Sequence, residues 1–276
     1  MRKNFAEILK SAKIDIKKEY EKLYEMLYDQ DLDNGYGPKT SLYDEYNENF
    51  IHMWFRGTSL SLEDFDDEYG FDFDKYPPNF DIEYLIRFCE YFYNLSTAYM
   101  GVPNLLDRYN VTLITQQIYR VIEKIGYMPA EQDGFTIFVE KSIPAIAVSE
   151  IVPNELSYKV ISYNHHSMKG NLENKKETLL KLANLLEGKR KQLKSINSSL
   201  EDDLFYSFNN LNLRHNNKDI SYKEKYKKHI ADMSNTELEN WYDEIYQMCL
   251  LAFLEIEQIA RKKSFNELKR RIEENT

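Results

Sequence analysis

The sequence is poor in the residues that build turn-rich or covalently cross-linked folds. Its 276 residues include 9 glycines, 7 prolines and 2 cysteines. Scarce glycine and proline favour helices over turn-rich sheets. Cys89 and Cys249 both lie in apolar, helix-like segments. A disulfide framework is therefore excluded, and two buried, reduced thiols are expected, as is typical of the cytoplasm.

Long apolar segments are also missing. No apolar run approaches the roughly 18 residues that a membrane-spanning helix needs. The opening segment MRKNFAEILK lacks the apolar stretch of a secretory signal peptide. The sequence therefore predicts a cytoplasmic protein with no membrane partner.

The motifs of common cofactor and metal sites are absent as well. The chain contains no GxGxxG, GxxxxGK(S/T) or GxSxG element, which excludes the usual dinucleotide, P-loop and hydrolase sites. It has no CxxC or HExxH pair for zinc. Acidic segments that start at Asp29 and Asp64 lack the glycine and the glutamate of a calcium-binding loop. We therefore expect neither a metal nor a cofactor.

The charge of the chain is acidic overall but unevenly distributed. The net charge is −10, and residues 1–100 hold 21 acids against 11 bases. Residues 165–230 reverse this balance, with 14 bases against 8 acids. A local basic surface can neutralise phosphates even on an acidic protein. The simpler interpretation is that these lysines solvate helix faces.

Helical periodicity predicts five helices, over residues 4–28, 81–99, 111–125, 172–197 and 234–272. The last has the clearest start, because Ser234 is a natural N-cap and Glu237 would complete a capping box. Its buried face is expected to include Trp241, Met248 and Cys249.

Other segments predict strands and loops. Short β-type runs at 135–139, 145–148 and 158–163 indicate a small sheet. Residues 29–79 show no period and predict a long irregular segment. Within it, residues 63–74 interleave acids with aromatic rings, so this loop could dock a basic protein partner. The alternative is a solvated loop that its rings anchor.

The predicted fold class is mainly α with a small antiparallel β-sheet in the middle, an α+β arrangement. Residues 1–163 would form a helical region that carries the sheet, and residues 164–276 an all-α C-terminal domain.

The densest polar chemistry lies in the turn 209–217, where one arginine and one histidine stand among five asparagines. RNA cleavage without a metal needs proton transfer and a cation at the phosphate. His215 could move the proton, Arg214 could clamp the phosphate, and Asn216 could position the backbone. Alternatively, Arg214 pairs with an acid of a neighbouring helix and the asparagines cap helix ends.

A second polar cluster lies at 163–171, between a predicted strand and a predicted helix. The helix after Gly170 would present its positive end beside Lys169, which suits an anion. With the basic run that follows the polar turn, this cluster completes the predicted RNA-binding set: Asn212, Asn217, His165, His166, Lys169, Lys223, Lys225, Lys227 and Lys228.

The order of elements in residues 164–276 resembles a HEPN domain: a long helix, a second helical segment, a polar turn and a long amphipathic helix. HEPN domains are all-α, often dimerise, and many are metal-independent ribonucleases of toxin–antitoxin, abortive-infection and CRISPR systems. Their hallmark is an arginine followed after four to six residues by histidine, whereas Arg214 and His215 are adjacent. The resemblance implies a homodimer of bacterial conflict or phage defence that binds RNA, and a candidate endoribonuclease that uses Arg214, His215 and Asn216.

Two other functions fit the sequence. A non-catalytic interaction module would use the last helix and the segment 63–74 to bind a second copy or a partner. A winged-helix-like DNA binder would combine the helix 111–125 with the hairpin that follows it, but only Arg120 and Lys124 supply cations there.

Overall fold

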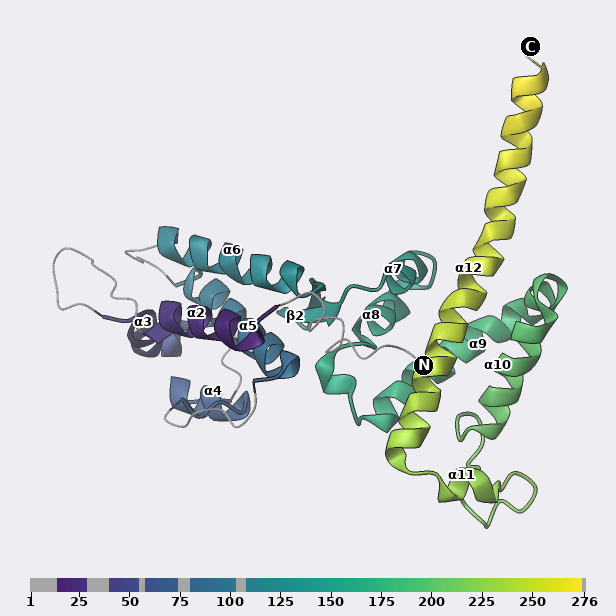
Figure 1. The fold of residues 1–276 in the computed structure, drawn as a ribbon, viewed down its shortest axis with the longest axis horizontal. Coiled ribbons are helices and arrows are strands. Elements are labelled where there is room, and N and C mark those ends of the chain that lie inside the picture. Colours follow the sequence, from purple (N-terminus) through teal and green to yellow (C-terminus); the bar gives the residue numbers. More distant parts are fainter. Residues whose placement is uncertain (1–13, 29–39, 55–57, 74–79, 103–107, 275–276) are drawn as a thin grey trace. The chain divides into compact units, whose positions relative to one another are not determined.

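The computed structural model describes residues 14–28, 40–54, 58–73, 80–102 and 108–274, with only the backbone for 108–110. Over these ranges the chain is mainly helical with a two-stranded antiparallel sheet, which confirms the predicted fold class. Two compact units form, unit 1 (Met1–Lys141) and unit 2 (Ser142–Thr276), and each has its own hydrophobic core. Figure 1 labels their elements.

Unit 1 is built around α5 (Ile82–Tyr99), which packs against α2, α3, α6 and β2. Most of α5 is buried, Cys89 included, so the predicted helix and its buried thiol are confirmed. The other elements of the unit are α2 (Ile16–Tyr28), α3 (Leu42–Asn49), η1 (Phe50–His52), α4 (Leu62–Glu68), α6 (Arg108–Lys124), β1 (Tyr127–Gln132) and β2 (Phe135–Glu140).

Side chains of α5 take the place of a third strand beside β2. The amide of Asn94 donates to the carbonyl of Thr136 (2.8 Å) and accepts from its backbone N–H (2.9 Å). The buried carboxylate of Glu90 accepts from the backbone N–H of Phe138 (2.7 Å). These bonds satisfy strand groups that would otherwise have no partner, so they fix the hairpin against the central helix.

We expect Asn94→Ala to lower the free energy of unfolding of unit 1 by about 1–3 kcal/mol, because two strand groups lose their partner. Denaturant unfolding followed by Trp54 fluorescence, in a Trp241→Phe background, measures this. Glu131→Ala, at an exposed position of β1, is the control and should change stability by less than about 0.5 kcal/mol. Equal stability of the two variants would show that the hydrogen bonds of Asn94 to β2 do not stabilise unit 1.

The prediction of an irregular segment at 29–79 is wrong for its described parts, which contain α3, η1 and α4. Ser41 and Ser61 cap α3 and α4 with their hydroxyls, a local signal that weak periodicity concealed. The rings of Phe65 and Phe71 lie in the core, so they cannot contact a partner as the predicted docking loop requires. Between them, Asp66 is buried and accepts hydrogen bonds from tyrosine hydroxyls.

Two of the three predicted strands of the sheet are helices. Residues 145–148 belong to α7 (Ile143–Ser149), and most of 158–163 belongs to α8 (Asn154–Ser162). Short apolar runs do not distinguish a strand from a buried helix. The capping hydroxyl of Ser142, with proline in the first turn of α7, is the helix signal that decides here. The true partner of β2 is β1, joined through Asp133-Gly134, both at positive φ.

Unit 2 therefore begins earlier than predicted, at Ser142 instead of residue 164. The reason is that α7 packs against α12 and α8 against α9. The remaining elements are η2 (His166–Met168), α9 (Leu172–Ile196), α10 (Ser198–Asn210), α11 (Lys228–Asp232) and α12 (Asn235–Glu274).

The long helices α9 and α12 form the centre of unit 2. The buried ammonium of Lys175 on α9 lies 2.7 Å from a carboxylate oxygen of Glu239 and 2.7 Å from one of Asp243 on α12. Burial opposes ionisation of Glu239, but the Lys175 ammonium and the Gly170 N–H outweigh it and lower the pKa of that carboxyl. These buried charges are paired, as a low-dielectric interior requires.

The start of α12 is confirmed and its predicted inward face is partly wrong. The Ser234 hydroxyl accepts from the backbone N–H of Glu237 (3.1 Å), and Cys249 is fully buried. Met248 is half-buried, whereas Trp241 is 47% exposed. The inward positions next to it are Leu238, Tyr242 and Ile245, so the indole lies at the margin of the buried face.

Candidate nucleic-acid interface in unit 2

The polar turn folds around one buried asparagine. The Asn217 side chain accepts from the backbone N–H of Asn212 (2.8 Å) and donates to the carbonyls of Asn209 (3.2 Å) and Lys225 (2.7 Å). It is fully buried, so the prediction that Asn217 contacts RNA is wrong. Its role is to hold together the segment between α10 and α11.

Arg214 is held by its own unit. Its guanidinium lies 2.7 Å from the Glu187 carboxylate on α9, donates to the Ala183 carbonyl (3.3 Å), and sits over the rings of Phe205 and Phe208 on α10. Arg214 thus pairs with an acid of a neighbouring helix, as the alternative interpretation of the polar turn predicts. An arginine so engaged would have to leave these partners to clamp a phosphate.

His215 and Asn216 have a different environment. The ring of His215 is half-exposed, and among the described residues it makes no hydrogen bond or ion pair. Asn216 is exposed. The three residues of the predicted catalytic set are adjacent in sequence but do not share a common target.

Stability should separate these roles. We expect Arg214→Ala to lower the free energy of unfolding of unit 2 by about 1–2 kcal/mol, because the ion pair and two ring contacts are lost. His215→Ala, one residue away, should change it by less than about 0.5 kcal/mol. Trp241 fluorescence in a Trp54→Phe background reports the unfolding of unit 2. If the Arg214→Ala variant is as stable as wild type, Arg214 has no structural role and is again a candidate for RNA contact.

The second polar cluster divides in the same way. His165 is buried, and its Nδ1 caps η2 through the backbone N–H and hydroxyl of Ser167, so its predicted contact with RNA is wrong. His166 is half-exposed and Lys169 is exposed. Only the latter part of the cluster reaches a pocket.

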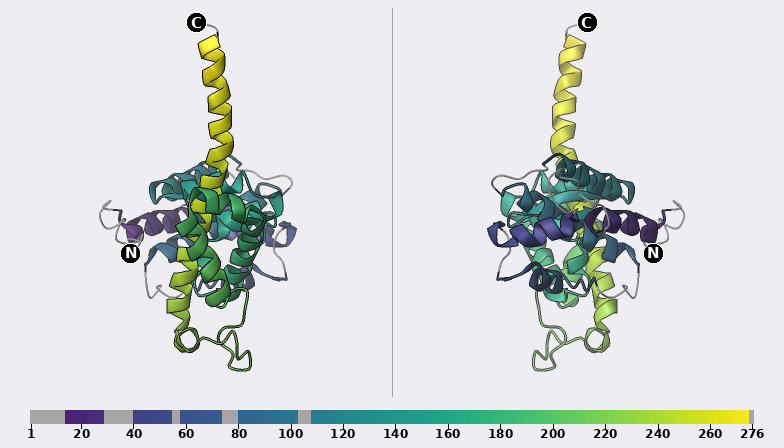
Figure 2. Two further views of the ribbon diagram at one scale, coloured as in Figure 1. Left: turned by 90° about the vertical axis from the view of Figure 1, so that its right-hand side faces the viewer. Right: turned by 90° about the vertical axis from the view of Figure 1, so that its left-hand side faces the viewer.

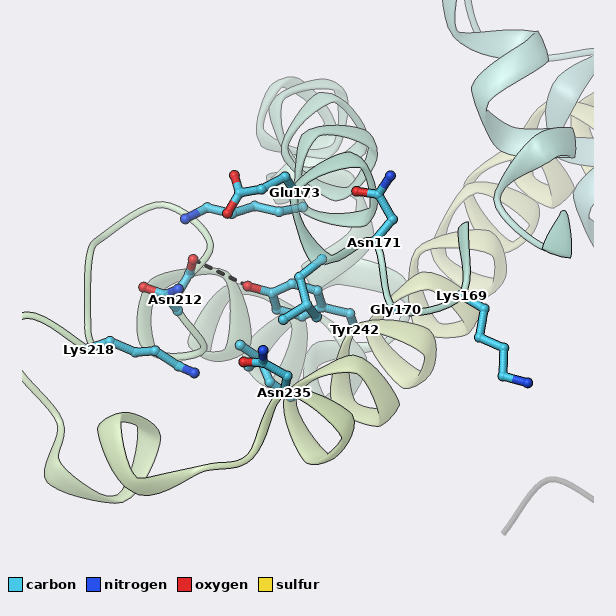
Figure 3. Close-up of a pocket in the computed structure, with 11 residues that line it drawn as sticks. Lys169, Gly170, Asn171, Glu173, Asn212, Lys218, Asn235 and Tyr242 are labelled. Atoms are coloured by element: carbon cyan, nitrogen blue, oxygen red, sulfur yellow. Dashed lines mark hydrogen bonds between the residues drawn. The ribbon is translucent and has the colours of Figure 1, made fainter. Parts of the chain in front are cut away.

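That pocket, the α9 pocket, has a volume of about 630 Å³ and lies between the start of α9, the polar turn and the start of α12. Figure 3 shows Lys218, Asn212 and Asn235 around the ring of Tyr242, with Glu173 above them and Lys169 directed away. Its lining residues are Lys169, Gly170, Asn171, Leu172, Glu173, Lys176, Asn212, Lys218, Asn235, Leu238 and Tyr242.

The α9 pocket is suited to an anion. Lys176 and Lys218, from two separate segments, line it, whereas the side chain of Lys169 points away, and the start of a 25-residue helix, the positive end of its dipole, also lines it. Burial raises the pKa of Tyr242 to about 12, so its phenol stays protonated and donates to the Asn212 carbonyl (3.4 Å). Glu173 is the opposing charge in the lining.

A second concavity, the aromatic groove, lies between α10, α11 and α12 and has a volume of about 520 Å³. The rings of Tyr206 and Trp241 line it and are 69% and 47% exposed. Its remaining lining residues are Asp203, Ser207, Asn210, Leu211, Lys227, His229, Ile230, Met233 and Met248. Exposed rings beside polar groups and lysine make a surface on which planar groups can stack.

The basic run links the two pockets. Lys223, Lys225, Lys227 and Lys228 are all exposed, which the predicted phosphate contacts require. Lys218, at one end of the run, lines the α9 pocket, and Lys227 lines the aromatic groove. The two ends are tied by a bond from the Lys227 N–H to the Asn217 carbonyl (2.9 Å).

The sequence alone identifies neither ring of the groove. Its helical period predicts Trp241 on the buried face of α12, and Tyr206 is one of 22 tyrosines with no distinguishing neighbour. The spacing of the buried positions Leu238, Tyr242 and Ile245 places Trp241 at the edge of the buried face of α12, and this spacing is the signal that could have identified it.

Comparisons of the chain with protein-family models, with curated proteins and with solved structures found no match. Within the described ranges, none of the helices is both long enough and apolar enough to cross a membrane.

Proposed function

We propose that unit 2 binds single-stranded RNA across its two pockets, with phosphates at the α9 pocket and bases against Tyr206 and Trp241. The observation that carries this proposal is the aromatic groove beside the exposed basic run. Stacking on exposed rings combined with cationic contacts to the backbone is the usual chemistry of single-strand binding. Asp203, Ser207 and Asn210 add hydrogen-bonding groups for base edges and ribose hydroxyls.

The division of charge between the units supports this location. Unit 2 holds 21 Lys and Arg against 20 Asp and Glu, a balance of +1. Unit 1 holds 15 against 26, a balance of −11. Unit 1 would repel a phosphate backbone, whereas unit 2 would tolerate it. The acidic character of the chain therefore does not oppose RNA binding at unit 2.

The proposal does not include cleavage by Arg214, His215 and Asn216, because Arg214 is engaged by Glu187 and two phenylalanine rings. The HEPN resemblance, a role in phage defence and a cytoplasmic location stay predictions.

We expect RNA binding to weaken steeply with salt and the basic run to set the slope. Replacing Lys223, Lys225, Lys227 and Lys228 with Gln should reduce the slope of log K against log salt by up to about 3, since each phosphate contact contributes about 0.7 for single strands. Fluorescence anisotropy with a labelled single-stranded RNA, at several salt concentrations, measures it.

A matched variant removes the same charge elsewhere in unit 2. Lys189, Lys191, Lys262 and Lys263 are exposed and line neither pocket. Their replacement with Gln should leave most of the slope intact. If both quadruple variants lose the same slope, binding is non-specific attraction to the unit and the proposed surface is wrong.

The interaction-module function stays a second candidate, because one observation favours it. The distal half of α12 carries large apolar side chains in water, and Phe265 alone is 62% exposed. Homodimerisation through this helix is compatible with RNA binding at the pockets.

A further inference from the structure

The distal half of α12 carries an apolar stripe whose side chains are exposed in the part of unit 2 that the structure describes. From Ala260 to Glu274 every residue is exposed. Figures 1 and 2 show this end of the helix, in yellow, extending past α9 and α10. Phe265, Leu268 and Ile272 are 62%, 50% and 59% exposed. Their spacing of three and four residues places them on one face of the helix.

The stripe continues toward the packed half of the helix with the spacing of a coiled coil. Alternating steps of three and four residues connect seven positions, and five of the seven are apolar: Leu251, Leu254, Gln258, Arg261, Phe265, Leu268 and Ile272. Leu251, at the proximal end, is 48% exposed. Apolar side chains exposed at this spacing are those that a partner helix covers in a coiled coil.

Charges beside the stripe favour one partner and one orientation. Glu257 flanks its proximal part, and Lys269 and Arg271 flank its distal part, whereas Arg270 lies on the opposite face of the helix. An antiparallel second copy would place Glu257 opposite the partner's Arg271, twice across a two-fold axis. A parallel copy would place Arg261 beside the partner's Arg261 inside the seam, which costs energy.

We propose that two copies of this chain associate through an antiparallel pairing of the distal halves of α12. In this register Phe265 faces the partner's Arg261, whose guanidinium can lie on the ring. Leu268 faces the partner's Gln258. Ile272 faces the partner's Leu254, which is half-buried and also packs against the core of its own unit. Lys262 meets the partner's Lys262 near the axis, which is the like-charged contact of the arrangement.

This association specifies the partner and the helix orientation for the second candidate function, the interaction module. It does not depend on RNA binding. The helix holds its form before pairing through ion pairs one turn apart, Arg261 with Glu257 (3.8 Å) and Arg271 with Glu267 (2.6 Å). Pairing would exchange some of these exposed intrahelical bonds for bonds between copies.

Sedimentation velocity over a range of concentrations tests the association. We expect a species of twice the chain mass of 33.0 kDa that dissociates on dilution. Replacing Phe265, Leu268 and Ile272 with Ser should give a monomer with unchanged helix content by circular dichroism. The matched control replaces Leu60, Ile143 and Ile220 with Ser. These side chains are more exposed than the stripe (79%, 71% and 73%) and lie elsewhere, so this variant should still dimerise.

Single cysteines test the orientation, since Cys89 and Cys249 are buried and cannot compete. Under mild oxidation Ser264→Cys should cross-link, because this position meets itself near the antiparallel axis. Ile272→Cys should not, because it would meet itself only in a parallel pair. A wild-type chain that is monomeric at every concentration, a triple-serine variant that still dimerises, or cross-linking of Ile272→Cys alone would each overturn the proposal.

Discussion

The surface of unit 2 depends on the buried side chain of Asn217. Three hydrogen bonds from this one amide join the end of α10, the polar turn and the approach to α11. Asn212 and Lys218 reach the α9 pocket from one side of that node, and Leu211 and Lys227 reach the aromatic groove from the other. The polar turn therefore forms a shared wall of the two pockets, and the Asn217 side chain supplies the partners that its tight backbone needs.

Charged side chains of unit 2 fall into two groups, those paired within the unit and those exposed on its surface. Arg214, Lys175 and Glu201 are placed where carboxylates or ammonium groups complete them, so their charges stabilise the packing of α9, α10 and α12. By contrast, Lys223, Lys225, Lys227 and Lys228 of the basic run are exposed. The polar residues of this region therefore have two roles. The paired ones stabilise the packing, and only the exposed ones can contact a ligand.

The sequence predicted the long helices because their apolar positions repeat over many turns, as in α5, α9 and α12. It failed where the signal is short: the runs at 145–148 and 158–163 are as apolar as a strand, and only Ser142 and the neighbouring proline mark the first as a helix. For the candidate site, residue type predicts the basic run, and Lys223, Lys225, Lys227 and Lys228 are exposed as this prediction requires. The burial of His165 and Asn217 and the pairing of Arg214 depend on contacts with η2, the chain near Lys225 and α9, and no local sequence pattern contains these contacts.

The central claim is that single-stranded RNA contacts the aromatic groove of unit 2. The most direct measurement is the fluorescence of Trp241 in a Trp54→Phe protein, titrated with a single-stranded RNA. If bases stack on the indole, the emission falls saturably and with the same midpoint as binding measured by anisotropy. RNA that binds by anisotropy while Trp241 emission stays constant, or no binding even at low salt, would contradict the account.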